Sequence, residues 1–476
     1  MRHRDAAVSR LWLLGALGLG LACVAPRSGS PPALGPGGVV PASGSREIAS
    51  GSLGPLTVRK WRLSNGLDVI TVPDAGARSI SYVTTYRVGS RDEDAADGKT
   101  GLAHLCEHLL FTGAPRGQVT AEFDQRLEEA GGTSNAMTSH DFTSYVDDIP
   151  PRLLERTVHL EADRMVNLEL SPAAVASERD IVVEERLQSS QDDIDGELEE
   201  LVYDQAFRNH PYRFPVIGRM ADIKAVTRDS VHDFYKRHYG PSEAVVILAG
   251  QFDEAVALPM LAAVYGALPA AEAGPAPPAV NPERPEREVR STIERPVPAD
   301  RFMMGLPAPG LADPDRATYE VLDELMTGGQ AARLYRALIV DRDLASSLEA
   351  ELGQTRDPGL WTIVVQMMKG QRAETAEQVI RRELEGIITA PVPDAELGAA
   401  RNRLETAFWR TLSSSQGRAQ ALGQWDVVTG DFRNLLRRGA AYAGVSPADL
   451  SRVARAYLAS GARSVVIARP KGTASP

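Results

Sequence analysis

Apolar and polar residues alternate in short runs along the chain, and longer segments with helical spacing lie between these runs. The stretch VRKWRLSNGLDVITV, residues 58–72, alternates on both sides of Asn65-Gly66, which predicts a β-hairpin. The stretch AVVILAGQFD is continuously apolar at its start, which predicts a buried strand that ends near Gly250. Strand-like and helical patterns interleave between these two segments, so the pattern predicts a protein built from both helices and strands.

Two segments far apart in the chain share one pattern. Residues 227–250, TRDSVHDFYKRHYGPSEAVVILAG, and residues 446–469, SPADLSRVARAYLASGARSVVIAR, each contain a capped helix, a tyrosine, a short turn and a Val-Val-Ile strand. The matching Val245 and Val465 are 220 residues apart. This repetition predicts an internal duplication of one domain type.

A proline-rich stretch separates the two copies and predicts the domain boundaries. It places a linker at residues 269–288, an N-terminal domain at residues 55–268 and a C-terminal domain at residues 289–470. The length of 476 residues also favours two or more domains. The formal net charge of −11, without clusters of Lys or Arg, argues against nucleic acid as a partner.

The first residues have the pattern of an export signal. Residues 1–22 combine a basic start with an apolar run that is too short to span a bilayer comfortably, and Cys23 follows. The ending LGLAC resembles a bacterial lipoprotein signal, in which Cys23 would carry the lipid, although Gly20 replaces the usual leucine. Residues 23–54 are rich in Pro, Gly and Ser, which predicts a flexible tether. We expect an exported, periplasmic protein, with lipid anchoring and simple secretion both open.

The stretch GLAHLCEHLLFTG, residues 101–113, carries the first candidate chemistry. At about 100° per residue, a helix here places His104, Glu107 and His108 on one face and its leucines on the other. Two imidazoles one turn apart can hold one Zn²⁺ at about 2.0–2.1 Å, and Glu107 suits a general base. Histidines at this spacing also occur on ordinary polar helix faces, so a zinc site needs a further ligand elsewhere.

A second helix offers that ligand. Ser171 followed by proline is a strong helix start. On this helix Glu178, Val182 and Glu185 lie on one face, whereas Glu184 points elsewhere, which favours Glu185 as the ligand. The same pattern is also typical of a charged helix with a solvated face.

These motifs together resemble one known family. The HxxEH motif is followed, 77 residues after His108, by Glu185 in an ERxxVxxEE-like helix. The stretches LSNGLDVIT, GGTSNAMTSHDFTSY, HPYRFPVIG, HYGPSEAVVILAGQFD, GLPAPG and GGQAARLY extend the likeness over nearly the whole mature chain. The chain resembles the pitrilysin/insulinase-type inverzincin metallopeptidases, and within them the short bacterial and mitochondrial-processing-peptidase-like members.

The resemblance implies a role for each matching residue. His104, His108 and Glu185 match the zinc ligands of the family, for one Zn²⁺ per chain, and Glu107 matches its catalytic base. Glu178 matches a second glutamate of the motif, which supports the site from behind the ligands. The resemblance therefore implies a zinc metalloendopeptidase.

The resemblance also implies how peptides bind and how the chain folds. Asn135 and Ala136 match a strand edge beside the zinc, where an extended peptide would pair through its backbone. The implied fold is α+β, with two related domains that each have an antiparallel sheet and helices packed on one side. Such a chain forms half of a clamshell, so we expect a dimer that encloses peptides or loosely folded polypeptides.

One departure from the family bears on the partner. Active members often carry an Arg and, seven residues later, a Tyr in the second half, and the matching positions here are Ile339 and Ser346. A heterodimer with a similar half-length chain that carries the pair is therefore expected, with a homodimer as the alternative. Some relatives have lost catalysis, so an inactive scaffold or assembly subunit stays open as the second function.

Overall fold

The computed structural model describes most of the chain after the first 43 residues. The described residues are 44–112, 114–115, 127–189, 193–270, 282–459 and 461–472. The predicted signal peptide at residues 1–22 and Cys23 lie outside them. Within the described residues, no helix is both long enough and apolar enough to cross a membrane.

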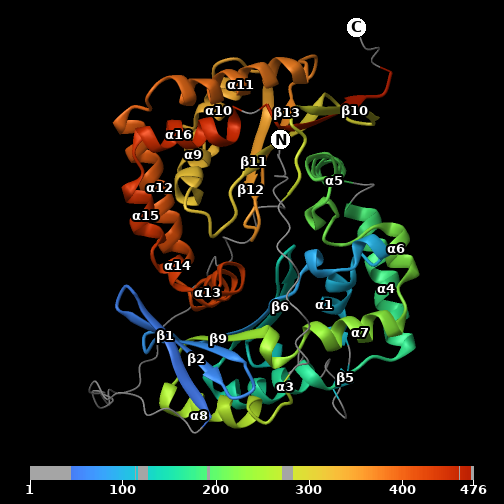
Figure 1. The fold of residues 1–476 in the computed structure, drawn as a ribbon, viewed down its shortest axis with the longest axis vertical. Coiled ribbons are helices and arrows are strands. Elements are labelled where there is room, and N and C mark those ends of the chain that lie inside the picture. Colours follow the sequence, from blue (N-terminus) through green and yellow to red (C-terminus); the bar gives the residue numbers. More distant parts are fainter. Residues whose placement is uncertain are drawn as a thin grey trace, which may run out of the picture. The chain divides into compact units, whose positions relative to one another are not determined.

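The first half of the chain forms a seven-stranded sheet in the order β1-β2-β3-β9-β4-β7-β6 (Figure 1). Its strands are β1 (Ser45–Leu53), β2 (Leu56–Leu63), β3 (Asp68–Pro73), β4 (Ile80–Tyr86), β6 (Thr133–Thr138), β7 (Thr143–Ile149) and β9 (Ala244–Gly250). Strands β2 and β3 pair antiparallel around Asn65-Gly66, with Gly66 at φ 92°, so the predicted hairpin is confirmed. The predicted buried strand at β9 is also confirmed, because every one of its residues is buried.

The second half forms a five-stranded sheet in the order β10-β14-β11-β13-β12. Its strands are β10 (Val289–Arg295), β11 (Arg301–Ala308), β12 (Ala345–Leu352), β13 (Gly359–Met367) and β14 (Ser464–Pro470). This order repeats β3-β9-β4-β7-β6 strand for strand, including one parallel pair, β3 with β9 and β10 with β14. The predicted α+β fold of two related halves is confirmed, with the addition that each mainly antiparallel sheet contains this parallel pair.

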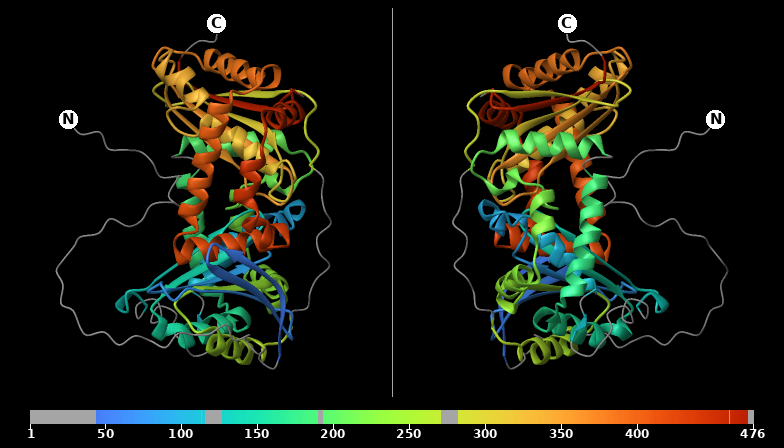
Figure 2. Two further views of the ribbon diagram at one scale, coloured as in Figure 1. Left: turned by 90° about the vertical axis from the view of Figure 1, so that its left-hand side faces the viewer. Right: turned by 90° about the vertical axis from the view of Figure 1, so that its right-hand side faces the viewer.

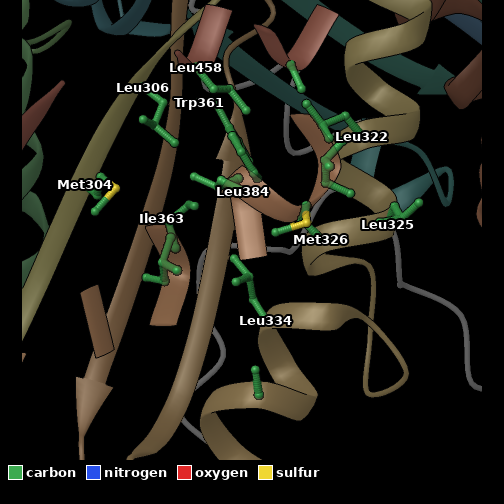
Figure 3. Packing of buried hydrophobic residues seen from close by; sticks show 14 of the residues in the cluster. Met304, Leu306, Leu322, Leu325, Met326, Leu334, Trp361, Ile363, Leu384 and Leu458 are labelled. Atoms are coloured by element: carbon green, nitrogen blue, oxygen red, sulfur yellow. The ribbon is translucent and has the colours of Figure 1, made fainter. Parts of the chain in front are cut away.

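Helices accompany both sheets. In the first half they are α1 (Leu102–Thr112), α3 (Leu154–Val166), α4 (Pro172–Leu187), α5 (Ile194–Ala206), α6 (Met220–Ala225), α7 (Arg228–His238) and α8 (Glu254–Tyr265). In the second half they are α9 (Arg316–Thr327), α10 (Arg333–Tyr335), α11 (Ala373–Thr389), α12 (Asp394–Thr411), α13 (Ser415–Thr429), α14 (Arg433–Leu436), α15 (Arg438–Gly444) and α16 (Pro447–Leu458). Figure 3 shows the core of the second half, where Leu322 and Met326 of α9 pack near Trp361 of β13.

One helix from each half packs on the sheet of the other half (Figures 1 and 2). Helix α5 packs on β11 and β14, where Leu198 and Val202 join the core formed with Met303. Helix α13 packs on β4 and β9, and it approaches so closely that a Cβ on Gly423 would lie 2.6 Å from Thr85 Oγ1. The ranges 55–268 and 289–470 therefore each contain the strands of one sheet, except that β1 lies before residue 55. They do not separate the two hydrophobic cores, because α5 and α13 each pack on the sheet of the other half.

The tether predicted for residues 23–54 is wrong in its last part. Residues Ser45–Leu53 form β1, which pairs antiparallel with β2. The strand was missed because few of its side chains are buried, so it shows no apolar alternation. Its Gly51 leaves room for Leu436 of α14, since a Cβ there would lie 2.4 Å from Leu436 Cδ1. In the predicted linker, residues 269–270 and 282–288 contain no helix or strand, and 271–281 lie outside the described residues.

Candidate metal centre

Helix α1 is anchored by its apolar face and exposes part of its polar face. Leu105, Cys106 and Leu109 are buried, while His104 and His108 are only partly buried. This is the division that the helical spacing predicted.

The start of α1 is held by a residue that the sequence pattern did not reveal. The buried Glu93 accepts hydrogen bonds from the backbone N–H groups of Gly101 (2.9 Å) and Ala103 (2.8 Å). The carboxylate thereby takes the place of an N-cap side chain and fixes the helix that carries both histidines. Because Glu93 lies several residues before the helix, outside the usual cap position, only the tertiary structure identifies it.

Helix α4 begins as predicted. Ser171 caps it by accepting a hydrogen bond from Ala174 N at 3.1 Å, and the proline follows in the first turn. Along this helix Glu178 is buried, whereas Glu184 and Glu185 are exposed. Of the two adjacent glutamates, Glu185 is the one that the structure places against the histidines.

The three predicted ligands converge in space. His104 Nε2 lies 3.8 Å from Glu185 Oε1, and His108 Nε2 lies 3.5 Å from Glu185 Oε2. The two imidazole rings are 4.8 Å apart between centroids. Among the described residues, these three form the one group of three or more His, Cys, Asp or Glu side chains whose donor atoms lie within 4.8 Å of one another.

The donor set fits a zinc ion. Two ligands that are each about 2.0–2.1 Å from a tetrahedral ion are separated by about 3.4 Å, close to the distances observed here. Glu178 Oε2 lies 3.3 Å from His108 Nδ1, so it is placed to orient that ring from the side away from Glu185. Nδ1 of His104 is buried and has no hydrogen-bond partner among the described residues.

The electrostatics of the histidines differ. Burial lowers the pKa of His104 to about 4, so this imidazole is neutral at neutral pH, as a ligand must be. Hydrogen bonding to Glu185 raises the pKa of His108, and the same contact lowers the pKa of Glu185. Glu185 is therefore ionised and available to a cation.

Glu107 faces strand β6 rather than Glu185. Its Oε2 accepts a hydrogen bond of 2.5 Å from Thr138 Oγ1. Burial raises the pKa of Glu107 above its usual value, although the hydrogen bond from Thr138 opposes this shift. A carboxyl group with a raised pKa is suited to general-base work near neutral pH. Sequence reasoning missed Thr138, although the alternation of strand side chains places it on the same face as Ala136.

The predicted substrate strand lies at an open edge. Strand β6 pairs with β7 on one side and is the last strand in its sheet, so its other edge is unpaired within the described residues. Asn135 is exposed, and its side-chain oxygen accepts a hydrogen bond from Ala136 N at 2.8 Å. Helix α1 packs against this strand.

The two positions at which the chain departs from the family pattern, Ile339 and Ser346, have different surroundings. Ile339 lies in the turn of helix after α10 and packs, partly buried, against the second core. Ser346 is exposed on β12 and donates a hydrogen bond to Gln366 O at 3.3 Å. Neither side chain carries a charge or an aromatic hydroxyl, as the sequence already indicated.

Comparison with known proteins places the chain in a family. Residues 69–219 match the model of insulinase, peptidase family M16, and residues 225–404 match the model described as the peptidase M16 inactive domain. The chain therefore belongs to peptidase family M16, and the resemblance inferred from its motifs is confirmed.

Relatives of similar length support a peptidase. An uncharacterized zinc protease of Mycobacterium leprae is 29% identical over 379 residues, which cover 79% of this chain and 84% of that protein. A zinc protease of Helicobacter pylori is 26% identical over 411 residues, with 86% and 92% covered. A probable mitochondrial-processing peptidase subunit beta of Arabidopsis thaliana is 23% identical over 415 residues, with 84% and 76% covered.

Solved structures show the same fold. The crystal structure of a protease from Helicobacter pylori superposes with a TM-score of 0.82 at 26% identity and covers 87% of this chain and 99% of that one. A peptidase M16 inactive domain from Pseudomonas fluorescens superposes with a TM-score of 0.79 at 17% identity, covering 88% of this chain and 100% of that one.

Proposed function

We propose that the protein is a zinc metalloendopeptidase. The observation that carries this proposal is the convergence of His104, His108 and Glu185, with Glu107 beside them and outside the ligand set. Two imidazoles and one carboxylate leave a fourth position for water, which is the arrangement of catalytic rather than structural zinc sites.

The residues divide the work of peptide hydrolysis. When bound, Zn²⁺ supplies a Lewis acid that lowers the pKa of water towards about 7. Glu107 accepts the proton of the water that attacks the scissile carbonyl, and it then returns a proton to the leaving amine. Glu178 holds the ring of His108 in place through Nδ1.

Peptides would bind along the open edge of β6. An extended chain that adds to this edge at Asn135 and Ala136 gains backbone hydrogen bonds with little demand on its sequence. The substrates are therefore peptides or loosely folded polypeptides that can present an extended segment, cleaved inside a chamber that two half-length chains close together.

A chelator and paired substitutions test the activity. Zinc-loaded protein should cleave a quenched fluorescent peptide, and a chelator should abolish this cleavage. Glu107→Gln should retain zinc while turnover falls about 10²- to 10⁴-fold. Glu185→Gln should lose zinc, whereas the adjacent Glu184→Gln, whose side chain is exposed, should keep both zinc and activity.

The same assay separates the enzyme from the inactive scaffold. Near-normal cleavage by Glu107→Gln would contradict the role of Glu107. Absence of zinc from the purified wild-type protein, together with no cleavage by the zinc-supplemented protein alone or with its partner, would favour the scaffold.

The partner is proposed to be a similar half-length chain that carries the Arg and Tyr absent at Ile339 and Ser346. Losing a charged and a neutral polar contact to substrate costs roughly 10²-fold in binding. Activity of the purified chain should therefore be low and should rise when the partner is added. Equal turnover by the chain alone and by the reconstituted pair would favour the homodimer.

The protein is further proposed to be exported to the periplasm and anchored to a membrane through a lipid on Cys23. The basic and apolar start of the sequence supports this proposal. Cys23→Ser should move the protein from the membrane fraction to the soluble periplasmic fraction. Unchanged membrane fractionation would contradict the lipid anchor.

A further inference from the structure

Thr138 joins the substrate strand to the catalytic helix through one hydrogen bond. It is the last residue of β6, and its Oγ1 donates to Glu107 Oε2 of α1 at 2.5 Å. Both side chains are partly buried, so water competes only weakly for this bond. This bond occupies one of the two carboxylate oxygens of Glu107.

The position of the Thr138 hydroxyl is set by a tightly bonded hairpin. Thr138 pairs with Thr143 at the closing end of β6 and β7. In the turn between them, Ser139 Oγ accepts hydrogen bonds from Asp141 N (3.2 Å) and Phe142 N (3.1 Å). Thr143 Oγ1 in turn donates to Val88 O at 3.0 Å. The backbone that presents Thr138 therefore has little freedom to move.

The hydrogen bond distinguishes the two oxygens of Glu107. A carboxylate on a side chain with several rotatable bonds is a poor base unless its orientation is held. Thr138 occupies Oε2 and thereby leaves Oε1 to receive a proton. Because Asn135 and Ala136 lie on the same strand, one element aligns both the peptide and the base.

We propose that Thr138 is a positioning residue, whose hydroxyl holds Glu107 with Oε1 directed to the attacking water, and this inference rests on the proposed peptidase function. It acts through Glu107 and does not touch the peptide bond. Removing the hydroxyl should therefore lower kcat and leave KM and zinc binding unchanged.

The test compares two substitutions of Thr138 with a control substitution elsewhere in the same sheet, each made in the full chain with its partner where one is required. Thr138→Val keeps the shape of the side chain and removes the hydroxyl, and we expect kcat for a quenched fluorescent peptide to fall about five- to thirty-fold. Thr138→Ser restores a hydroxyl and should recover most of kcat. Thr57→Val, at an exposed position of β2 in the same sheet, is the matched control and should change nothing.

A second measurement does not depend on activity. Thermal unfolding of the metal-free protein is compared for Thr138→Val, Glu107→Leu and the double variant. If the two side chains bond to each other, the decreases in Tm should not be additive. The Tm of the double variant should then fall clearly less than the sum of the decreases in the two single variants.

Three results would overturn the inference. These are an unchanged kcat in Thr138→Val, an equal loss in Thr138→Ser, or an effect on KM alone. If zinc-loaded wild-type protein cleaves no peptide with or without its partner, the proposed function fails, and additive decreases in Tm would then show separately that Thr138 does not hold Glu107.

Discussion

Helices α1 and α9 occupy equivalent places in the two halves, since each is the first α-helix after the equivalent strand: β4, which lies between β9 and β7, and β11, which lies between β14 and β13. The polar residues of the two helices make different contacts. On α9, Glu320 accepts hydrogen bonds from Arg316 (2.7 Å) and Tyr442 (2.6 Å), and Asp323 accepts one from the indole N–H of Trp361 (2.9 Å). On α1, the imidazoles instead face Glu185 across distances that leave space for an ion.

The titration of the α9 carboxyl groups shows the same contrast. Burial alone would raise the pKa of Glu320, but Arg316 and Arg438 hold it below its usual value. Burial raises the pKa of Asp323 to about 6. Hydrogen bonds from other side chains of the second half satisfy both carboxyl groups, so on α9 these residues stabilise the fold. One fold therefore supports either a candidate metal site or a structural network, depending on whether the polar side chains find partners within the chain.

Substitutions on the two equivalent helices, α1 and α9, should differ most strongly in their consequences. His108→Ala should remove zinc and lower peptide cleavage by at least about 10³-fold, because a ligand is lost. Glu320→Gln, at the equivalent helix of the other half, should keep zinc and cleavage but destabilise the protein by about 1–3 kcal/mol. Zinc content, turnover and urea unfolding measure these changes. A loss of zinc in Glu320→Gln would contradict the division of roles.

The next effect tests whether the halves are independent. Leu198 belongs to the first half in sequence but is fully buried on the second sheet. Leu198→Ala should destabilise the protein by about 2–5 kcal/mol. Calorimetry should show a single shifted transition in which both sheets unfold together, because α5 and α13 each pack on the sheet of the other half. Two well-separated transitions, of which only one shifts, would show that the exchanged helices do not couple the sheets.

A buried ion pair tests how α13, a helix of the second half, is held on the sheet of the first half. Asp426 of α13 lies 2.7 Å from the Nζ atom of Lys60 on β2. Asp426→Ala should cost about 2–3 kcal/mol, below the usual 3–5 kcal/mol for breaking a buried pair, because Asp68 remains 3.0 Å from Lys60. Urea unfolding measures the loss. A variant as stable as the wild type would mean that Asp68 alone satisfies Lys60.

The smallest effect concerns the segment between Ile339 and Ser346. Asp343 has φ 51° and is the one residue other than glycine with positive φ among the described residues. Asp343→Gly should stabilise the protein by about 0.5–1 kcal/mol, because glycine adopts this conformation without strain. Asp341→Gly, at φ −87°, is the control and should destabilise slightly. Equal changes in Tm for the two variants would contradict this explanation.

Much of the fold was accessible from the sequence. The hairpin at Asn65-Gly66, the start of α4 at Ser171 and the duplication of the two halves follow from local patterns, and the structure confirms all three. For the candidate site, the histidines, Glu107 and Glu185 were predicted, and the structure brings them together. Their catalytic roles stay predictions until zinc and turnover are measured.

Helical spacing alone indicates which side chains share a helix face, because it is a property of neighbouring residues. It therefore identified His104, Glu107 and His108 as a group, and Glu178 and Glu185 as another. Three further features are visible only in the folded protein: Glu93 caps α1, Thr138 bonds to Glu107, and α5 and α13 each pack on the sheet of the other half. These contacts join residues that are distant in the chain or lie in different elements, and no local pattern of polar and apolar residues encodes which of the available surfaces will meet.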